Sequence, residues 1–366
     1  MTPTMYTYIN QEHAALTKIL ESYPTQIDAA LKDIELDAQN WLVLATGSSI
    51  NASRSAKLYM ENIANIHVQI EEPFNYTMYE TVSRNTDLVL GVSQSGQSTA
   101  TIDAIEKVSR QRSVSRIAVT SRPDTELPAA CDTTLDILTG KERVGYVTMG
   151  FNATVLSLML LALRFAKQSG AIDSAREKAE LSEFSNIIGR IPDTIKKSEA
   201  FYTQHRQEML TPRQYTAIGY GATVGTAMEF QTKFVEVVRY PAGGHDLEAF
   251  MHGPYLGIHK DDVQFYLVTD AQPTVIEKMA ALRNYEARYI DNIFTINLGK
   301  NQNTDGHNSL DLGAVDDPFK APILAVIPIQ LFAWLITNDH GVDLGHQIFT
   351  DFSEVVHNKT TVQDYV

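Results

Sequence analysis

One stretch, residues 87–112, constrains the fold of this chain more than any other. It begins with the short apolar run 88–92, passes through the serine-rich turn 93–98, and from Thr99 onward places isoleucine and valine at helical spacing. The pattern predicts a β-strand, a tight polar turn and an α-helix in direct succession. Because a helix is the usual connection between parallel strands, this stretch favours an α/β protein.

The rest of the first half follows the same alternation. Two amphipathic helices, broken near Pro24, are expected before it begins. Short apolar runs then alternate with helical patterns, which predicts a parallel, doubly wound sheet. In such a sheet ligands bind beyond the carboxyl ends of the strands, where the strand order reverses. The predicted strands are 41–45, 67–71, 87–92, 116–120 and 132–137.

The second half repeats the first at low identity. Residues 43–63 align with 217–237 when Gly47 is set on Gly221, and the same offset sets Asp87 on Asp261. We therefore expect an α/β fold of two similar doubly wound, flavodoxin-like three-layer units with flanking helices. The first would span 1–190 and the second 191–366 with the C-terminal tail, joined by a connection near 190–210.

Composition excludes several classes of partner. The net charge of −14 argues against nucleic acid and anionic membranes. A single cysteine, Cys131, cannot form an internal disulfide and suits a reducing cytoplasm, and the first residues show no export signal. The most apolar run, 321–336, is short for a bilayer and predicts a buried helix. We expect a cytoplasmic protein that does not bind membranes.

The turn 93–98 predicts an anion site. Its hydroxyls and N–H groups meet at the positive end of a helix dipole, and Gly96 allows close approach. No lysine accompanies the turn, unlike in a P-loop, so a phosphate monoester fits better than a nucleoside triphosphate. The alternative is a polar surface turn whose serines cap the helix. The loop 46–49 leaves the same sheet edge and could share the ligand. The second unit has residues 270–273 in place of the serine-rich loop, so we expect phosphate binding in the first unit alone.

A second group of polar residues lies in the other half. Glu229, Lys233 and Glu236 fall on one helical face, where the lysine can set the ionisation of a carboxylate. An ordinary solvated ion pair is the alternative. His252, in a Gly/Pro turn, could equally be a structural histidine. We expect no metal and no cofactor, because the remaining histidines show no ligand spacing: His245, His259, His307, His340, His346 and His357.

Three stretches together resemble the SIS (sugar isomerase) family of phosphosugar-binding proteins over nearly the full length. The first is the pair of loops 46–49 and 93–98, which look like the sugar and phosphate loops in the isomerase half of glucosamine-6-phosphate synthases. The second is 229–236, followed by His252-Gly253-Pro254. The third is 328–333 with the terminal segment 358–362.

The resemblance implies a role for each matching residue. Glu236 matches the base that moves a proton between C1 and C2 of the sugar, and His252 the ring-opening histidine, which a neighbouring subunit contributes in the family. Lys359 looks like the lysine that handles the open-chain sugar, although the segment before it is longer here and lacks the family's Pro-Arg-Asn. The implied phosphate and sugar ligands are Ser93, Gln94, Ser95 and Ser98, with Gly47, Ser48, Ser49 and Thr148 near the substrate.

One difference from the glucosamine-6-phosphate synthases narrows the range of implied reactions. The sequence shows no N-terminal glutaminase domain, so we expect no ammonia from glutamine by that route. Residues 247–254 look closer to the fructoselysine-6-phosphate deglycases, with Glu248 as a second acid or base. The leading hypothesis is a deglycase that acts on 6-phosphorylated sugar–amine adducts. An aldose–ketose or ammonia-dependent amino-sugar phosphate isomerase and a non-catalytic sugar-phosphate sensor stay open. The family implies a homodimer with shared active sites and leaves a tetramer open.

Overall fold

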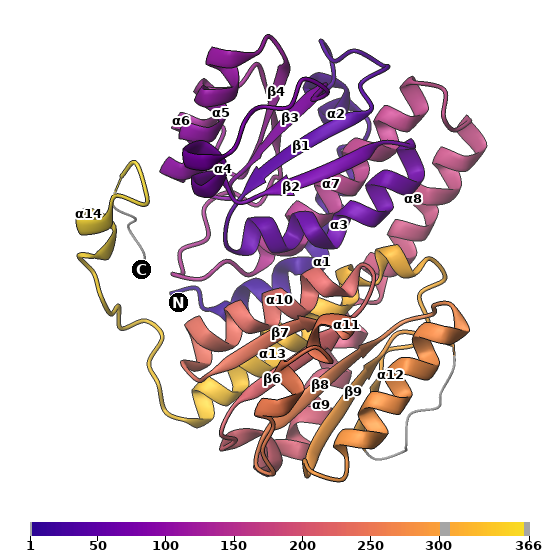
Figure 1. The fold of residues 1–366 in the computed structure, drawn as a ribbon, viewed down its shortest axis with the longest axis vertical. Coiled ribbons are helices and arrows are strands. Elements are labelled where there is room, and N and C mark those ends of the chain that lie inside the picture. Colours follow the sequence, from indigo (N-terminus) through magenta and orange to yellow (C-terminus); the bar gives the residue numbers. More distant parts are fainter. Residues whose placement is uncertain (1, 301–307, 362–366) are drawn as a thin grey trace. The chain divides into compact units, whose positions relative to one another are not determined.

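The computed structural model describes residues 2–300 and 308–361 and divides the chain into two compact units (Figure 1). The first unit comprises Met1–Asn186 together with Gly345–Val366, and the second comprises Ile187–Leu344. The sequence placed the tail with the second unit. The structure groups it with the first because hydrogen bonds join residues 357–361 to residues 97–99.

The first unit is built on a parallel sheet in the strand order β2-β1-β3-β4-β5. This is the flavodoxin-like order, which reverses direction between β1 and β3. The predicted parallel, doubly wound sheet is confirmed, and each predicted strand is present within one residue of its expected limits. The strands are β1 (Asn40–Ala45), β2 (His67–Glu71), β3 (Leu88–Val92), β4 (Ser115–Thr120) and β5 (Thr133–Asp136).

Helices cover both faces of this sheet. Leu42 and Leu44 pack against the apolar side of α5, whereas Trp41, one residue away, points to the other face and meets Phe165 of α7 edge to face at 5.1 Å. The alternation along β1 therefore produces three layers. The helices are α1 (Met5–Glu21), α2 (Thr25–Ala30), α3 (Ser48–Ala64), α4 (Pro73–Tyr79), α5 (Thr99–Gln111), α6 (Glu126–Ala129), α7 (Met149–Gln168), α8 (Ser174–Gly189) and α14 (Phe352–Val356).

The second unit repeats this architecture. Its parallel sheet has the order β10-β9-β8-β6-β7, which is the same topology in chain order, so the repeat read from the sequence is confirmed. Two strands were missed: β7 reads Ala-Gly-Gly-His-Asp, without the β-branched residues that mark strands, and β10 has three residues. The strands are β6 (Tyr215–Gly219), β7 (Ala242–Asp246), β8 (Val263–Val268), β9 (Asn292–Asn297) and β10 (Ser309–Asp311).

The helices of the second unit include one that the sequence reading treated as a connection. Residues 190–210 form α9, which packs along the central helix α13 and stacks Tyr202 on Phe332. The charged residues on its exposed side led the sequence analysis to treat it as a connection, although its other side is apolar and buried. The helices are α9 (Ile191–Leu210), α10 (Thr223–Lys233), the π-helical turn η1 (Phe234–Val238), α11 (Leu247–Phe250), η2 (Pro254–Gly257), α12 (Pro273–Glu286), η4 (Pro318–Lys320) and α13 (Pro322–Asp339).

Within the described part of the chain, two helices are long and apolar enough to cross a membrane, Met149–Gln168 and Pro318–Asp339. The prediction that the apolar run 321–336 is too short to span a bilayer is therefore wrong. Nearly all residues of both helices are nevertheless buried inside their own units, as the helices of a protein core are. The predicted buried helix is confirmed by this packing rather than by its length.

Candidate active site

The predicted phosphate loops meet at the carboxyl edge of the first sheet. β1 and β3 are paired neighbours that end together, with Ala45 opposite Val92. α3 and α5 start directly after them, with Gly47 and Ser98 at their N-caps, and neither cap side chain bonds the helix backbone. Two helix N-termini without a side-chain cap therefore point to the switch point of the sheet, which favours an anion.

Hydrogen bonds from the end of β4 and the residue after it fix the backbone of the serine-rich loop. The Gln94 carbonyl accepts hydrogen bonds from the backbone N–H and the hydroxyl of Ser121, at 3.1 and 2.8 Å, and from the hydroxyl of Thr120 at 3.2 Å. Gly96 has φ +66°, and a Cβ there would lie 1.9 Å from Oγ1 of Thr125. Only glycine allows this loop to pass so close to the next segment. Ser93 and Ser98 are buried, whereas Gln94, Ser95, Ser48 and Ser49 are half-buried and Gly47 is exposed.

Replacing Gly96 with alanine tests whether this loop geometry is required. We expect the free energy of unfolding to fall by about 1–3 kcal/mol more than for Gly140→Ala, and phosphosugar binding to weaken with it. Gly140 is the matched control because it has φ +64° but nothing within 4 Å of its Cβ position. Chemical denaturation and phosphosugar titration measure the two effects. Equal behaviour of the two variants would contradict the required close approach.

A buried carboxylate that the sequence reading did not single out organises the same edge. Glu142 accepts hydrogen bonds from the backbone N–H groups of Thr148 and Gly150, at 3.0 and 2.6 Å, and from Nε2 of Gln94 at 3.4 Å. It therefore caps α7 and orients Gln94. An acidic residue shortly before an apolar helical run was the available signal. Thr148 is fully buried and donates its hydroxyl to the carbonyl of Tyr146, so its predicted substrate contact stays a prediction.

Lys359 lies against the serine-rich loop. Its Nζ donates to the hydroxyl of Ser95 at 3.0 Å, and residues 98 and 359 form an antiparallel bridge. The neighbouring backbone is tied down by Thr99, which donates to Asn358, and by Thr360, which donates to Gln97. Burial lowers the pKa of the Lys359 ammonium. The structure thus brings Lys359 to a predicted phosphate ligand.

The second unit holds an ion triad, two members of which are fully buried, at the junction of two helical geometries. Lys233 ends α10 with no exposed surface, 3.1 Å from Oε1 of the equally buried Glu229. One turn on, Glu236 lies within the π-helical turn η1 and accepts a hydrogen bond from the same ammonium. A π-helical turn is rare and is often found at functional sites. It leaves the Glu236 side chain 35% exposed, whereas the Lys233 side chain that it contacts is fully buried.

The protonation of Glu236 reflects two opposing effects. Desolvation raises the pKa of its carboxyl above the usual value, and the ammonium of Lys233 lowers it in part. Burial also lowers the pKa of Lys233, but the two carboxylates beside it outweigh burial and raise it, so the lysine stays charged. A carboxylate with a raised pKa and a fixed cation suits proton abstraction more than an exposed glutamate does.

His252 and Glu248 form a separate exposed pair in the second unit. Nε2 of His252 lies 3.2 Å from Oε1 of Glu248, and Lys278 donates to Oε2 of the same carboxylate at 2.5 Å. Asp246 places Glu248 by capping α11. Hydrogen bonds from Lys278 and His252 lower the pKa of Glu248, so the carboxylate is charged at neutral pH. His252 is 74% exposed.

The structure thus forms three local groups from the predicted site residues. Among the described residues, the Glu236 group and the Glu248 group share no hydrogen bond or ion pair. No cluster of three or more His, Cys, Asp or Glu side chains that could hold a metal occurs in 2–300 and 308–361, and His307 lies outside these residues. Burial raises the pKa of the Cys131 thiol to about 12, which makes this thiol a poor nucleophile.

Comparison with known proteins agrees with the architecture. Residues 36–165 match the family model described as the SIS domain. The glutamine–fructose-6-phosphate aminotransferase (isomerizing) of Gloeobacter violaceus is 26% identical over 314 residues, which cover 85% of this chain and 51% of that protein. The chain therefore spans about half the length of this curated relative.

Two solved structures share the fold. The C-terminal domain of the glucosamine-fructose-6-phosphate aminotransferase of Francisella tularensis superposes with a TM-score of 0.83 at 20% identity, covering 93% of this chain and 96% of that one. A glucosamine-6-phosphate deaminase from Thermotoga maritima gives 0.73 at 18% identity, covering 93% and 96%. At these identities the likeness establishes the fold alone.

Proposed function

Because residues 36–165 belong to the SIS domain family, we propose that the protein is a phosphosugar-processing enzyme, a deglycase of 6-phosphorylated sugar–amine adducts. The observation that carries the proposal is Glu236, a carboxylate with a raised pKa that a buried lysine holds in a π-helical turn. A sensor that only binds its ligand has no use for such a group, whereas the removal of a proton from carbon requires one.

Substrate binding in this proposal begins with the phosphate. The uncapped N-termini of α3 and α5, with Ser93, Ser95 and Ser98, supply N–H and hydroxyl donors for a phosphate monoester. The ammonium of Lys359 adds a positive charge beside Ser95. Binding energy from the phosphate, remote from the reacting carbons, holds the open-chain sugar in position.

The chemical step is a proton transfer next to a carbon–nitrogen bond. Glu236 removes the proton from the carbon that bears nitrogen. The electron pair left behind forms a double bond to the neighbouring carbonyl carbon, whose oxygen takes up a proton, and the product is an enaminol. Return of a proton to that neighbouring carbon gives an imine, and water adds to the imine to release the free amine. An adduct at C1 yields glucose 6-phosphate, and an adduct at C2 yields fructose 6-phosphate.

The His252–Glu248 pair supplies the remaining proton transfers in the proposal. His252 opens the sugar ring, and the charged carboxylate of Glu248, 3.2 Å away, orients the imidazole. The same pair can accept a proton from the water that attacks the imine. This assignment rests on the resemblance together with the contact between the two side chains.

Lys359 favours a second candidate, an amino-sugar 6-phosphate isomerase that uses ammonia or an amine. The lowered pKa of its ammonium makes the neutral amine more accessible, and a neutral amine can react with an open-chain carbonyl. The curated relative is named an isomerizing aminotransferase, and its reaction also concerns fructose 6-phosphate.

The pH dependence of turnover should carry the signature of Glu236. The base must be ionised, and its pKa is raised, so kcat/KM should fall on acidification at a pH above the ordinary glutamate pKa of about 4.3. Removing the ammonium in Lys233→Met takes away the effect that lowers this pKa, so the acid limb should move to still higher pH. An unchanged limb in that variant would show that another group sets it.

Product analysis separates the candidates. The protein is incubated with fructoselysine 6-phosphate and with its C2-linked glucose counterpart, and a dehydrogenase coupled to glucose 6-phosphate, with added isomerase for fructose 6-phosphate, reports release. We expect product from one adduct and none with Glu236→Gln. Interconversion of glucosamine 6-phosphate and fructose 6-phosphate with ammonia, without adduct cleavage, would replace the deglycase by the isomerase. Tight phosphosugar binding without either reaction would leave a sensor.

A further inference from the structure

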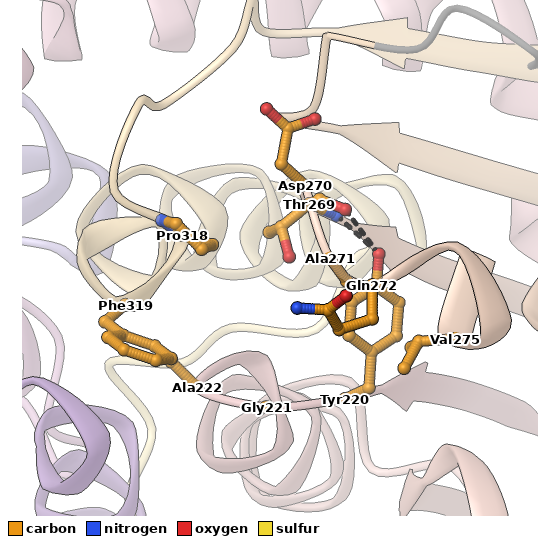
Figure 2. A pocket seen from close by; sticks show the side chains of 10 residues that line it. All are labelled: Tyr220, Gly221, Ala222, Thr269, Asp270, Ala271, Gln272, Val275, Pro318 and Phe319. Carbon is orange, nitrogen blue, oxygen red and sulfur yellow. Dashed lines mark hydrogen bonds between the residues drawn. The ribbon is translucent and has the colours of Figure 1, made fainter.

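The second unit contains a pocket of about 460 Å³ at the carboxyl edge of its own sheet (Figure 2). The turn 220–222 follows β6, the loop 269–272 follows β8, and Pro318 and Phe319 close the opposite side. β6 and β8 are the strands between which the order of this sheet reverses, which is where flavodoxin-like folds bind ligands. The volume lies within the range of small-molecule sites.

This pocket occupies the place that the phosphate loops occupy in the first unit, but its chemistry differs. With Gly47 set on Gly221, Ser48 corresponds to Ala222, and Ser49 to Thr223. The Thr223 hydroxyl is used within its own turn, accepting from the backbone N–H of Tyr220 at 3.1 Å and donating to the Tyr220 carbonyl at 2.8 Å. The hydroxyl of Ser48 therefore has no counterpart in this turn, and the counterpart of the Ser49 hydroxyl is engaged within the turn.

Charge also argues against an anion. None of the lining residues is lysine, arginine or histidine, and the one charged residue is an acid, Asp270. Its Oδ1 accepts the backbone N–H of Lys300 at 2.8 Å, which holds the carboxylate at the rim of the pocket. Nζ of the exposed Lys300 lies 4.0 Å from Oδ2 of this carboxylate and offsets part of its charge. No cation lies among the lining residues themselves, so a phosphorylated ligand would find no direct positive partner in the pocket.

One buried polar group nevertheless points into the pocket. Thr269 is only 4% exposed, and its hydroxyl interacts with the hydroxyl of Tyr220. Figure 2 shows this hydroxyl and the amide of Gln272 directed toward the space between Phe319 and Tyr220. A hydroxyl has one donor and two acceptor positions, so that of Thr269 can bond a ligand group in addition to Tyr220.

The walls around these polar groups are apolar and fixed. The hydroxyl of Tyr220 donates to the carbonyl of Thr269 at 2.6 Å and accepts from the N–H of the same residue at 2.9 Å, which locks the tyrosine ring against the pocket. Phe319 is held opposite by the short helix η4, whose N-cap Asp317 accepts the N–H of Phe319 at 3.0 Å. Such a site is preorganised for a ring with one apolar face.

We propose that this pocket binds an uncharged, hydroxyl-bearing ring, the chemical class of an unphosphorylated sugar. One apolar face of the ring packs on Phe319, and its hydroxyls bond Thr269 and Gln272. The proposal does not depend on the reaction assigned to Glu236, and it places a second, phosphate-independent sugar site on the unit that lacks the phosphate loop.

The test is a saturation-transfer NMR titration of the full chain with D-glucose in the presence of saturating glucose 6-phosphate. We expect saturable glucose binding that the phosphosugar does not displace. Phe319→Ala should weaken it about tenfold by removing a ring-sized apolar contact. Ala271→Trp should block it, because this exposed alanine lines the mouth of the pocket, whereas Ala281→Trp, also exposed but outside the lining, is the matched control.

Unfolding midpoints of the three variants establish that they are folded. Absence of saturable glucose binding would overturn the proposal. Displacement of glucose by glucose 6-phosphate would overturn it too, because both would then occupy one site. Binding that survives both Phe319→Ala and Ala271→Trp would place the sugar elsewhere and have the same consequence.

Discussion

Replacing Glu236 with glutamine is expected to lower kcat by about 10³-fold while the dissociation constant of the phosphosugar stays nearly unchanged. The amide keeps the shape of the side chain and can still contact Lys233, but it cannot accept a proton from carbon. The proposed phosphate ligands lie on other elements, in the loops after β1 and β3, and are untouched by this change. Steady-state kinetics and equilibrium binding of the phosphosugar measure the two quantities separately.

The matched control for this variant is Glu277→Gln, which removes the same charge from an exposed position on α12. It should keep full activity. Loss of phosphosugar binding along with activity in Glu236→Gln would mean that Glu236 is a binding group instead of a base. Retained turnover would remove it from the mechanism.

The second large effect is expected on stability. Replacing Lys233 with methionine should reduce the free energy of unfolding by about 3–5 kcal/mol, because the fully buried carboxylate of Glu229 then loses the ammonium 3.1 Å away. Methionine preserves most of the apolar stem, so the change isolates the charge. Denaturant titration of the variant against the parent protein measures the loss.

A double variant distinguishes charge from packing. Glu229→Gln combined with Lys233→Met leaves no buried ion at either position, and it should recover a large part of the stability that Lys233→Met alone loses. Failure to recover would attribute the loss to packing around the lysine stem. Lys233→Met without any measurable destabilisation would show that the triad is not the buried, tightly coupled group described here.

Much of the fold could be predicted because the decisive signals are local. The strand–turn–helix pattern around residues 87–112 and the match of Gly47 to Gly221 each depend on short stretches of sequence, and both led to the right type of sheet, parallel and doubly wound in each unit. The strand β7 was not predicted, because its sequence, Ala-Gly-Gly-His-Asp, contains no residue with a high strand propensity. Its place in the sheet comes from tertiary context: a Cβ at Gly244 would lie 2.0 Å from the carbonyl oxygen of Ala227 in α10.

The candidate site was less accessible from sequence because its contacts join distant positions. The spacing of Glu229, Lys233 and Glu236 predicted one helical face, but the π-helical turn that exposes Glu236 leaves no mark in the sequence. The contact of Lys359 with Ser95 and the capping of α7 by Glu142 depend on chain folding, so neither could be derived. Sharing of His252 between subunits stays a prediction, since the structure describes a single chain.

The most direct test of the central claim is to follow proton exchange on carbon. The protein is mixed in D2O with the sugar–amine 6-phosphate that it binds, and NMR monitors the signal of the proton on the carbon that bears nitrogen. The account predicts that this signal disappears as deuterium replaces the proton, and that it persists with Glu236→Gln under conditions where that variant is saturated. A bound adduct whose proton never exchanges with the parent protein, or exchanges equally with Glu236→Gln, would contradict it.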